Sequence, residues 1–320
     1  MKKIAALVLV FVIIILSPLL LYKNKTKIKI NAADHTKDSD VNVTVSVDGE
    51  IKEMSLDYYL FGVLVGEMPV TFPMEALKAQ AVAARTYTVS QMLKKPKDNH
   101  PDAQVCTDST CCKAYLDPME ALYVWGEEAF SKSDIIRQAI SDTDGMIIVY
   151  EEEPITAVFF STSWGHTLDA SLVWGNSVPY LVSVKSEGEE ISPRYRGQVV
   201  IKNDDFKDTV LKYNENARFN GSADKWIKDI KRNYTGAVNS ASIGGITLSG
   251  REIRTLFGLN SVNFEVSFKD GEIIFDTLGF GHEVGMSQYG ACVMAQNGKN
   301  FNEIITHYYT DVEIVKYKLT

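Results

Sequence analysis

The chain has 320 residues, of which 45% are hydrophobic and 23% charged, and its net charge at pH 7 is −8. This length and composition are those of a globular protein with one large or two medium domains. The acidic balance excludes nucleic acid as the main partner, because neutralising phosphates needs a basic surface. It neither favours nor excludes a sugar substrate.

The N-terminus predicts a membrane anchor. Two lysines precede an apolar run over residues 4–22, which is close to the roughly 20 residues that span a bilayer. A cleaved signal peptide is the alternative, but its apolar stretch is shorter and a small-residue cleavage site follows it. Four lysines follow the run closely, a balance that by itself places the C-terminal bulk inside the cell. We nevertheless expect residues 1–22 to anchor an extracytoplasmic domain, because of the motifs below.

Residues 23–42 are polar and charged without periodicity and predict a flexible tether. VNVTVSV at 41–47 alternates as a strand does. From Leu56, apolar residues recur with helical spacing until Pro69 ends the helix. A second, alanine-rich helix begins near Pro73 and continues through MEALKAQAVAARTYTVSQML.

The remaining chain mixes helices and strands. IIRQAISDTDGMIIVY predicts a short helix, a turn and a strand, and ITAVFFSTS predicts another strand. Residues 186–240 are polar, with helical patches around 203–231. ASIGGITLSGREIRTLFGL predicts a strand, a turn and a short helix, and VNFEVSFKDGEIIF predicts a hairpin. We therefore expect an α+β fold, with one compact catalytic body over residues 43–320, a substrate cleft, and a preceding transmembrane helix.

Glu67 is the candidate for acid–base chemistry. It lies in GVLVGEMPVTF, at the C-terminal end of the apolar helix, where the helix dipole disfavours an ionised carboxylate. Apolar neighbours act in the same direction by desolvation. A carboxyl group kept in its acid form is what glycosidic cleavage needs from its general acid. The position is also that of an ordinary solvated glutamate at a helix end.

Three further segments carry groups suited to a sugar. On the second helix, Gln80 and Tyr87 are seven residues apart and share a face, and Arg85 lies in an alanine-rich surface. The alternative is that Arg85 pairs with a carboxylate and Tyr87 belongs to the core. STSWGH at 161–166 offers hydroxyl groups and the indole of Trp164, which stacks on sugar rings. GFGHEVGMSQYGA is a glycine-rich loop that permits close approach of a ligand, without phosphate-loop spacing.

Three of the four cysteines cluster, and a histidine precedes them. Thiolates and an imidazole are ligands of tetrahedral Zn²⁺, whereas a disulfide from Cys106 to either neighbour is the alternative outside the membrane. We expect a structural Zn²⁺, and no cofactor for the chemistry. The expected ligands are His100, Cys106, Cys111 and Cys112.

Three blocks together resemble the stage II sporulation protein D family: GVLVGEMPVTFPMEALKAQAVAARTYT, FFSTSWGHTLDASLVWGNSVPYLVSVKS and GHEVGMSQYGA. The resemblance extends over about residues 41–315. Members of that family are lytic transglycosylases that cleave peptidoglycan during engulfment in spore-forming bacteria. The resemblance implies that Glu67 is the catalytic acid/base. It also implies that a set of polar residues lines the glycan groove: Gln80, Arg85, Tyr87, Ser161, Ser163, His282, Ser287 and Gln288.

The chain departs from the family at two positions that are commonly glycine, Trp164 and Glu283. We expect Trp164 to add a stacking platform or to narrow the groove, and Glu283 to place a second carboxyl group near the site. The resemblance further implies a single-pass protein of the cell membrane with its domain in the intermembrane space. It implies peptidoglycan strands as substrate, and as partners the amidase stage II sporulation protein P and membrane protein M.

Three hypotheses for the function follow. A lytic transglycosylase needs one carboxyl group, because the 6-hydroxyl of muramic acid attacks its own ring and leaves a 1,6-anhydro end; the amidase partner favours peptide-stripped strands. A glycosidase usually needs two carboxyl groups, about 5–5.5 Å or 6.5–9.5 Å apart, with Glu283 or another acid as the second. The remaining hypothesis is a non-catalytic protein that binds the wall or enhances an amidase.

Overall fold

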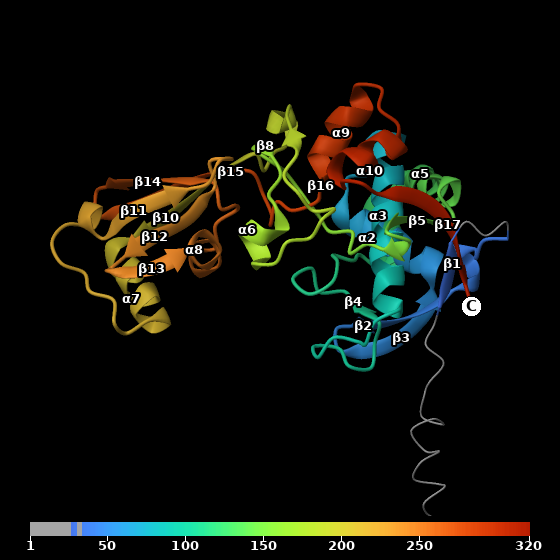
Figure 1. The fold of residues 1–320 in the computed structure, drawn as a ribbon, viewed down its shortest axis with the longest axis horizontal. Coiled ribbons are helices and arrows are strands. Elements are labelled where there is room, and N and C mark those ends of the chain that lie inside the picture. The colour runs from blue at the N-terminus through green and yellow to red at the C-terminus, as the bar shows by residue number, and fades with distance from the viewer. Residues whose placement is uncertain (1–26, 31–33) are drawn as a thin grey trace, which may run out of the picture.

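The computed structural model describes residues 27–30 and 34–320, so the predicted anchor lies outside the described residues. Among these residues, no helix has the length and apolar character needed to cross a membrane. They form two separate hydrophobic cores. We call residues 196–278 the small lobe and the rest of the described chain the main lobe; the two lie side by side along the long axis (Figure 1).

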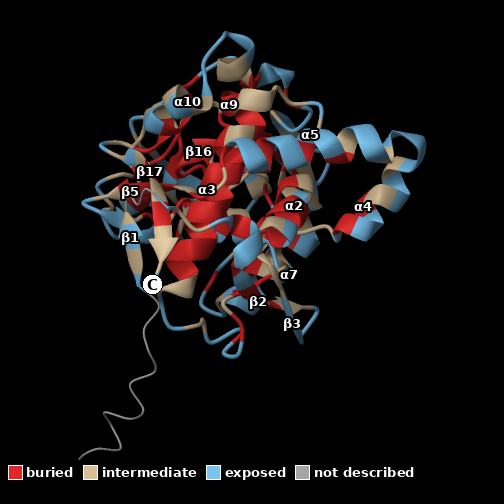
Figure 2. Ribbon diagram, turned by 90° about the vertical axis from the view of Figure 1, so that its right-hand side faces the viewer, coloured by how far each residue is buried: buried red, intermediate tan, exposed pale blue. Residues whose placement is uncertain are grey.

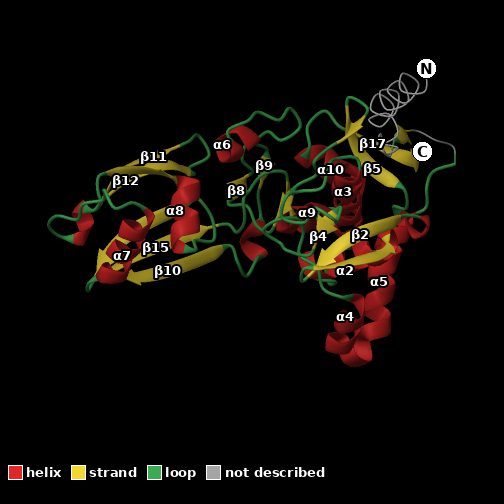
Figure 3. Ribbon diagram, turned by 90° about the horizontal axis from the view of Figure 1, so that it is seen from below, coloured by secondary structure: helices red, strands yellow, loops and turns green. Residues whose placement is uncertain are grey.

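Helix α3 is the centre of the main lobe. It is buried along most of its length (Figure 2), and its alanines leave room for α2, α5, α9 and α10 to pack against it. Helix α4 projects from this body with much of its surface exposed (Figures 2 and 3). The helices of the main lobe are α2 Leu56–Glu67, α3 Met74–Met92, α4 Pro118–Trp125, α5 Ala129–Asp142, α6 Ala170–Trp174, α9 Gln288–Gln296 and α10 Phe301–Tyr308.

Small sheets surround these helices. Their strand orders are β1-β17-β5-β6, β3-β2-β4, β16-β7 and β8-β9. The parallel pair of β16 and β7 matters most for function, because it places the second and third sequence blocks side by side. The strands are β1 Ile28–Ile30, β2 Asn42–Val47, β3 Glu50–Ser55, β4 Val105–Cys106, β5 Met146–Tyr150, β6 Glu153–Pro154, β7 Phe159–Phe160, β8 Gly165–His166, β9 Lys185–Ser186, β16 Met286–Ser287 and β17 Glu313–Leu319.

The predicted flexible tether is wrong where residues 23–42 are described. Ile28–Ile30 forms β1, which pairs antiparallel with β17, and Asp38–Asp40 forms a 3₁₀ turn in which Asp38 is buried. The alternation of lysine and isoleucine in KTKIKIN is a strand pattern. The acidic side chain of Asp38 turns inward because Arg85 lies beneath it.

The small lobe consists of two three-stranded antiparallel sheets, β10-β15-β14 and β11-β12-β13, with two helices. Aromatic rings fill its core; Phe257 stacks on Phe206 and Phe275 with ring centroids 4.7 and 5.3 Å apart. The predicted hairpin turns at Asp270 and Gly271, both with positive φ, as a two-residue turn requires. The elements are β10 Arg196–Lys202, α7 Asn203–Tyr213, β11 Ile227–Arg232, β12 Val238–Ile243, β13 Ile246–Ser249, α8 Gly250–Phe257, β14 Phe264–Lys269 and β15 Glu272–Leu278.

The mixed helix and strand class expected from the sequence is confirmed. The helices predicted after Leu56 and Pro73 are α2 and α3, with Pro73 as the residue that caps α3. ITAVFFSTS forms a strand over Phe159–Phe160 alone, because β16 offers only two residues for pairing.

Candidate active site

Glu67 is the last residue of α2 and is half-buried. Both carboxylate oxygens accept hydrogen bonds: Oε1 from the backbone N–H of Ala114 (2.8 Å), and Oε2 from Nε2 of Gln288 (3.1 Å). Leu116 N–H donates to the carbonyl of Gly62 on α2 (3.1 Å), so the segment after the cysteines lies along this helix. The structure thus brings together Glu67 and Gln288, two predicted site residues from distant blocks.

The start of α9 positions Gln288. Ser287 caps this helix by accepting a hydrogen bond from Gly290 N–H (3.3 Å). A side chain at Gly290 has no space, since a Cβ atom there would lie 1.9 Å from the hydroxyl of Tyr308. The glycine-rich block therefore serves close packing of the turn that aims Gln288 at Glu67.

Lys113 is a site residue that the sequence analysis missed. It is 5% exposed, and its Nζ lies 3.5 Å from the ring centroid of Phe159 and 4.4 Å from that of Tyr87. Burial lowers the pKa of Lys113 to about 8, against the opposing charges of Glu67 and Cys112. In the sequence it is one lysine in a loop, and nothing in its neighbourhood distinguishes it from a solvated one.

His282 is half-buried and lies between Phe160 and Trp174, with ring centroids 5.8 and 5.7 Å away. Its Nδ1 accepts a hydrogen bond from Val284 N–H (3.2 Å). Burial, followed by the positive charges of Lys113 and Arg254, lowers the pKa of His282 to about 3. The imidazole is therefore neutral at physiological pH.

Glu189 joins the second and third blocks, and the sequence analysis did not single it out. Its buried carboxylate accepts hydrogen bonds from Ser163 N–H (2.7 Å), from Ser287 Oγ (2.6 Å) and from Ser186 Oγ. Desolvation raises the pKa of Glu189 to about 7. Ser163 and Ser287 are fully buried, which corrects their expected place in the groove: both bind this carboxylate. Ser161 is half-buried, and its Oγ contacts Thr162 Oγ1 at 3.0 Å.

The expected groove positions on α3 are also corrected. Arg85 is fully buried and pairs with Asp38, with Nη2 2.6 Å from Oδ2. Gln80 is fully buried, and its amide atoms have no hydrogen-bond partner among the described residues. Tyr87 is 5% exposed, and its hydroxyl accepts from Nζ of Lys97 (3.0 Å). These side chains are buried because other elements pack around α3. The seven-residue spacing of Gln80 and Tyr87 therefore identifies a buried face of the helix.

The two departures from the family pattern lie at the junction of the lobes. The indole N–H of Trp164 donates to the carbonyl of Thr235 in the small lobe (3.0 Å). Glu283 is fully buried, and neither carboxyl oxygen has a hydrogen-bond partner within the described chain. Burial raises its pKa well above the usual range; the charges that act on it are those of Arg254 and Glu189. The expected proximity of Glu283 to Glu67 is therefore not supported.

The cysteine cluster fits a metal ion. One ligand atom from each of the four predicted residues lies within 4.8 Å of all the others: His100, Cys106, Cys111 and Cys112. Nδ1 of His100 donates to the carbonyl of Ala103 (2.8 Å), so its other ring nitrogen, Nε2, faces the thiols and lies 3.3 Å from the sulfur of Cys112. All four cysteines are free thiols, so the disulfide alternative is not formed.

The surroundings of Cys106 and Cys112 shift the pKa values of these two thiols in opposite directions. Burial raises the pKa of the Cys106 thiol to about 12. Burial acts in the same direction on Cys112, but the N–H of Cys106, the charge of Lys97 and the hydroxyl of Tyr87 outweigh it, so its pKa is lowered. Lys97 Nζ lies 3.6 Å from the sulfur of Cys112. These groups therefore make a thiolate less costly at Cys112 than at Cys106.

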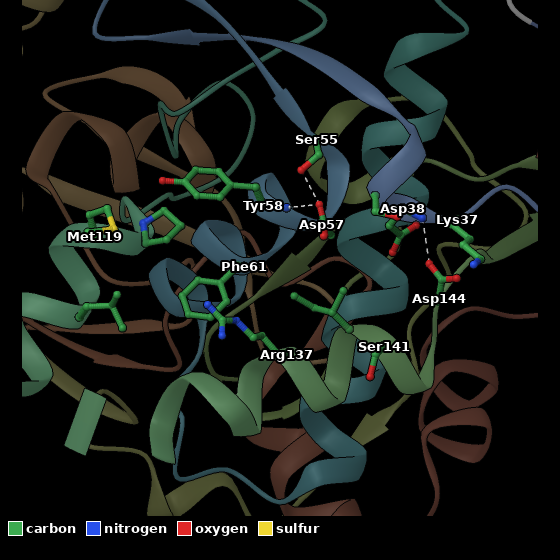
Figure 4. Close-up of a pocket in the computed structure, with 14 residues that line it drawn as sticks. Lys37, Asp38, Ser55, Asp57, Tyr58, Phe61, Met119, Arg137, Ser141 and Asp144 are labelled. Atoms are coloured by element: carbon green, nitrogen blue, oxygen red, sulfur yellow. Dashed lines mark hydrogen bonds between the residues drawn. The ribbon is translucent and has the colours of Figure 1, made fainter. Parts of the chain in front are cut away.

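A separate pocket of about 640 Å³ lies at the other end of α2 (Figure 4). It is lined by the 3₁₀ turn and by residues such as Asp57, Phe61 and Arg137. Glu67 is roughly 16 Å of helix away from Leu56, the first residue of α2. A second pocket lies in the small lobe. Neither borders Glu67, and the predicted substrate cleft stays a prediction.

The fold and the site define a two-lobed α+β protein in which the half-buried Glu67 is oriented by a backbone N–H and a glutamine amide. The family model "Stage II sporulation protein" matches residues 47–150. The chain is 37% identical over 292 residues to stage II sporulation protein D of Bacillus subtilis (strain 168), covering 90% of this chain and 83% of the relative. It is 36% identical over 281 residues to the Bacillus amyloliquefaciens protein of the same name, covering 87% and 80%.

The chain therefore belongs to the stage II sporulation protein D family. It also resembles a B. subtilis protein named amidase enhancer, with 26% identity over 306 residues that cover 81% of this chain and 40% of the relative. The resemblance recognised from the three sequence blocks is thus confirmed.

Proposed function

We propose that the chain is a lytic transglycosylase of peptidoglycan in which Glu67 is the sole acid/base. The observation that supports this most is the contrast between two carboxyl groups. Glu67 is half-buried with both oxygens oriented by donors, whereas Glu283 is sealed within the protein. A chemistry that needs a single carboxyl group fits this arrangement, and a glycosidase that pairs Glu67 with Glu283 does not.

The proposed reaction has two steps. Glu67, in its acid form, donates its proton to the oxygen that bridges N-acetylmuramic acid and N-acetylglucosamine, and the bond from that oxygen to carbon 1 of muramic acid breaks. The 6-hydroxyl of the same muramic acid then attacks carbon 1, and the Glu67 carboxylate accepts the hydroxyl proton. The products are a 1,6-anhydro end and a free 4-hydroxyl. Ala114 and Gln288 hold the carboxylate for both transfers.

The cellular setting is part of the proposal. The names of the relatives associate the family with sporulation. We propose action on peptide-stripped strands during engulfment, by a domain held outside the cell membrane by its N-terminal segment, together with the amidase stage II sporulation protein P and membrane protein M. The relative named amidase enhancer supports the rival, non-catalytic hypothesis.

A structural Zn²⁺ at the cysteine cluster completes the proposal. Three sulfurs and Nε2 of His100 form a soft, compact donor set. The same loop continues directly from Cys112 to Ala114, whose N–H holds Glu67. We propose that the metal fixes this loop and takes no part in the chemical steps.

The test is mass spectrometry of the products formed from peptide-stripped glycan by residues 27–320. We expect anhydro-ended sugars from the unmodified protein, no product from Glu67→Gln, and near-normal product from Glu283→Gln. Reducing ends that disappear in both variants would instead identify a two-carboxyl hydrolase. Absence of any cleavage by the unmodified protein would support the amidase-enhancing hypothesis.

A further inference from the structure

The ammonium group of Lys113 has no direct ion-pair partner among the described residues, although the charges of Glu67 and Cys112 act on it. Its nearest contacts are the faces of Phe159 and Tyr87, which favour a cation but provide no carboxylate. Among the described residues, Lys113 forms no ion pair and no hydrogen bond through Nζ. The buried polar atoms that lack both a hydrogen-bond partner and any solvent contact do not include Nζ of Lys113. Nζ therefore keeps some contact with solvent.

The neighbouring charges are already engaged. Both oxygens of Glu67 accept hydrogen bonds from other donors. The thiols have their own cation in Lys97, which contacts the sulfurs of Cys111 and Cys112 at 4.0 and 3.6 Å. Lys113 is thus a buried cation close to Glu67, the proposed acid/base. None of the described residues forms an ion pair with it.

We propose that the ammonium group of Lys113 binds the lactyl carboxylate of the muramic acid whose glycosidic bond faces Glu67. This inference rests on the proposed function. The lactyl group is attached to carbon 3 of the ring whose carbon 1 carries the scissile bond, so its carboxylate lies within one ring's width of the acid. Lys113 precedes Ala114, which holds Glu67, and the two charges are therefore neighbours on the scale of one sugar.

The chemistry of this contact selects a substrate. In intact peptidoglycan the lactyl carboxyl group is an uncharged amide, because it carries the stem peptide. Only hydrolysis of that amide bond produces a carboxylate. A buried cation that recognises the carboxylate therefore places this protein after an amide-hydrolysing reaction, and makes peptide-stripped glycan the preferred substrate for a physical reason.

The test measures binding in a Glu67→Gln background, so that no substrate is consumed. The probes are peptide-free strands, the same strands with lactyl carboxylates converted to primary amides, and chitin hexasaccharide, which has no lactyl group. We expect the free carboxylate to bind best. Adding Lys113→Met lowers that affinity about 10- to 100-fold, the range for a lost charge-assisted hydrogen bond, and changes the other two affinities less than about twofold.

Three controls separate recognition from folding. Lys113→Arg retains the preference for the carboxylate, and Lys95→Met, which removes an exposed lysine, leaves all three affinities unchanged. Zinc content and melting temperature are measured for each variant, because Lys113 follows Cys112. If Lys113→Met does not fold, Lys113→Gln replaces it. A separate check uses the Glu67→Gln protein without a further change: its preference for the carboxylate strands over the amide strands is expected to shrink as the salt concentration rises.

The outcomes distinguish this inference from the proposed function. Equal weakening of all three probes by Lys113→Met, or no preference for the carboxylate in the background protein, overturns the inference even if the unmodified protein makes anhydro ends. Carboxylate-dependent binding through Lys113 without any anhydro product overturns the transglycosylase and leaves a carboxylate-selective glycan-binding site.

Discussion

The ion pair of Arg85 and Asp38 joins the N-terminal segment to helix α3. The guanidinium donates to both carboxylate oxygens from Nε (2.9 and 2.8 Å) and to the carbonyls of Ile140 and Met146. Both side chains are essentially inaccessible. The same guanidinium thus connects Asp38, the end of α5 and the start of β5.

Removal of this guanidinium leaves a buried carboxylate without its partner. We expect Arg85→Met to lower the free energy of unfolding by about 3–5 kcal/mol, measured by urea denaturation at pH 7. Lys78→Met is the matched control on the same helix, since Lys78 pairs with Glu75 and Asp142 where solvent screens both; its loss should be about 1 kcal/mol or less. Equal losses in the two variants would contradict the assigned role of Arg85.

Residue types in the sequence indicated Glu67 and Gln288 as candidate site residues, but residue types do not predict which way a side chain points. Glu67 and Gln288 were predicted and meet. Ser163 and Ser287 were also predicted, yet they face Glu189, which lies in the acidic stretch SEGEE and resembles a solvated loop. Only Ser287 binds Glu189 through its hydroxyl group, whereas Ser163 uses its backbone N–H and its hydroxyl donates to the carbonyl of His166. A serine in the sequence does not show which of these partners it takes.

At the scale of elements, Glu189 couples the folding of two loops to pH. Burial raises its pKa from about 4.5 to about 7. Below pH 4.5, Glu189 makes its full contribution to the free energy of unfolding. The contribution declines as pH rises, because the unfolded chain releases the Glu189 proton at a lower pH than the folded protein does, and it is lost once pH exceeds 7. The total amounts to roughly 3 kcal/mol.

Glu189→Gln removes this titration. We expect the unfolding free energy of the unmodified protein, relative to this variant, to fall by roughly 2–3 kcal/mol between pH 4.5 and about 7.5. Glu187→Gln, at an exposed acid of the same loop, should follow the unmodified protein at every pH. Parallel curves for all three proteins would exclude Glu189 as the titrating group.

The loop after β4 is the element that the proposed zinc ion is expected to stabilise most. It carries the three clustered cysteines and then Ala114. We expect one equivalent of zinc in the purified protein. At a metal concentration 100 times Kd, binding stabilises by about 2.7 kcal/mol, so chelation should lower the melting temperature by roughly 5–10 °C and slow cleavage at Glu67.

Cys292→Ala is the control for this prediction, because Cys292 is buried away from the cluster. It should keep its zinc, whereas Cys112→Ala should lose it. A metal-free protein with unchanged melting temperature would show that the four residues pack without any ion.

Local elements were predictable and distant pairings were not. Helices α2 and α3 and the β14–β15 hairpin follow from periodicity and turn residues within one segment. The pairing of β1 with β17 joins opposite ends of the chain, and residues 28–30 carry only two isoleucines to indicate it. The parallel pair β7–β16 is two residues long, too short for a pattern, yet it brings the second and third blocks together.

At the scale of the whole molecule, each lobe has its own core, although Ala237 and Val262 of the small lobe pack in the core of the main lobe. The small lobe begins and ends at paired positions, Arg196 opposite Leu278, and Gly279 N–H donates to Tyr195 O (2.8 Å). The two connections therefore lie side by side. Hydrogen bonds between the lobes include those of Trp164 with Thr235 (3.0 Å) and of Tyr234 with Asp169.

Replacing residues 196–278 with an Asn-Gly turn should leave a folded main lobe, because a two-residue turn closes adjacent antiparallel strands. We expect a cooperative urea transition and retained zinc, and we expect the fragment 196–278 to fold alone around its aromatic core. Near-ultraviolet circular dichroism of both pieces measures this, since each core contains aromatic rings. If neither piece shows fixed aromatic packing, the contacts at the junction are essential, and the two cores form one cooperative unit.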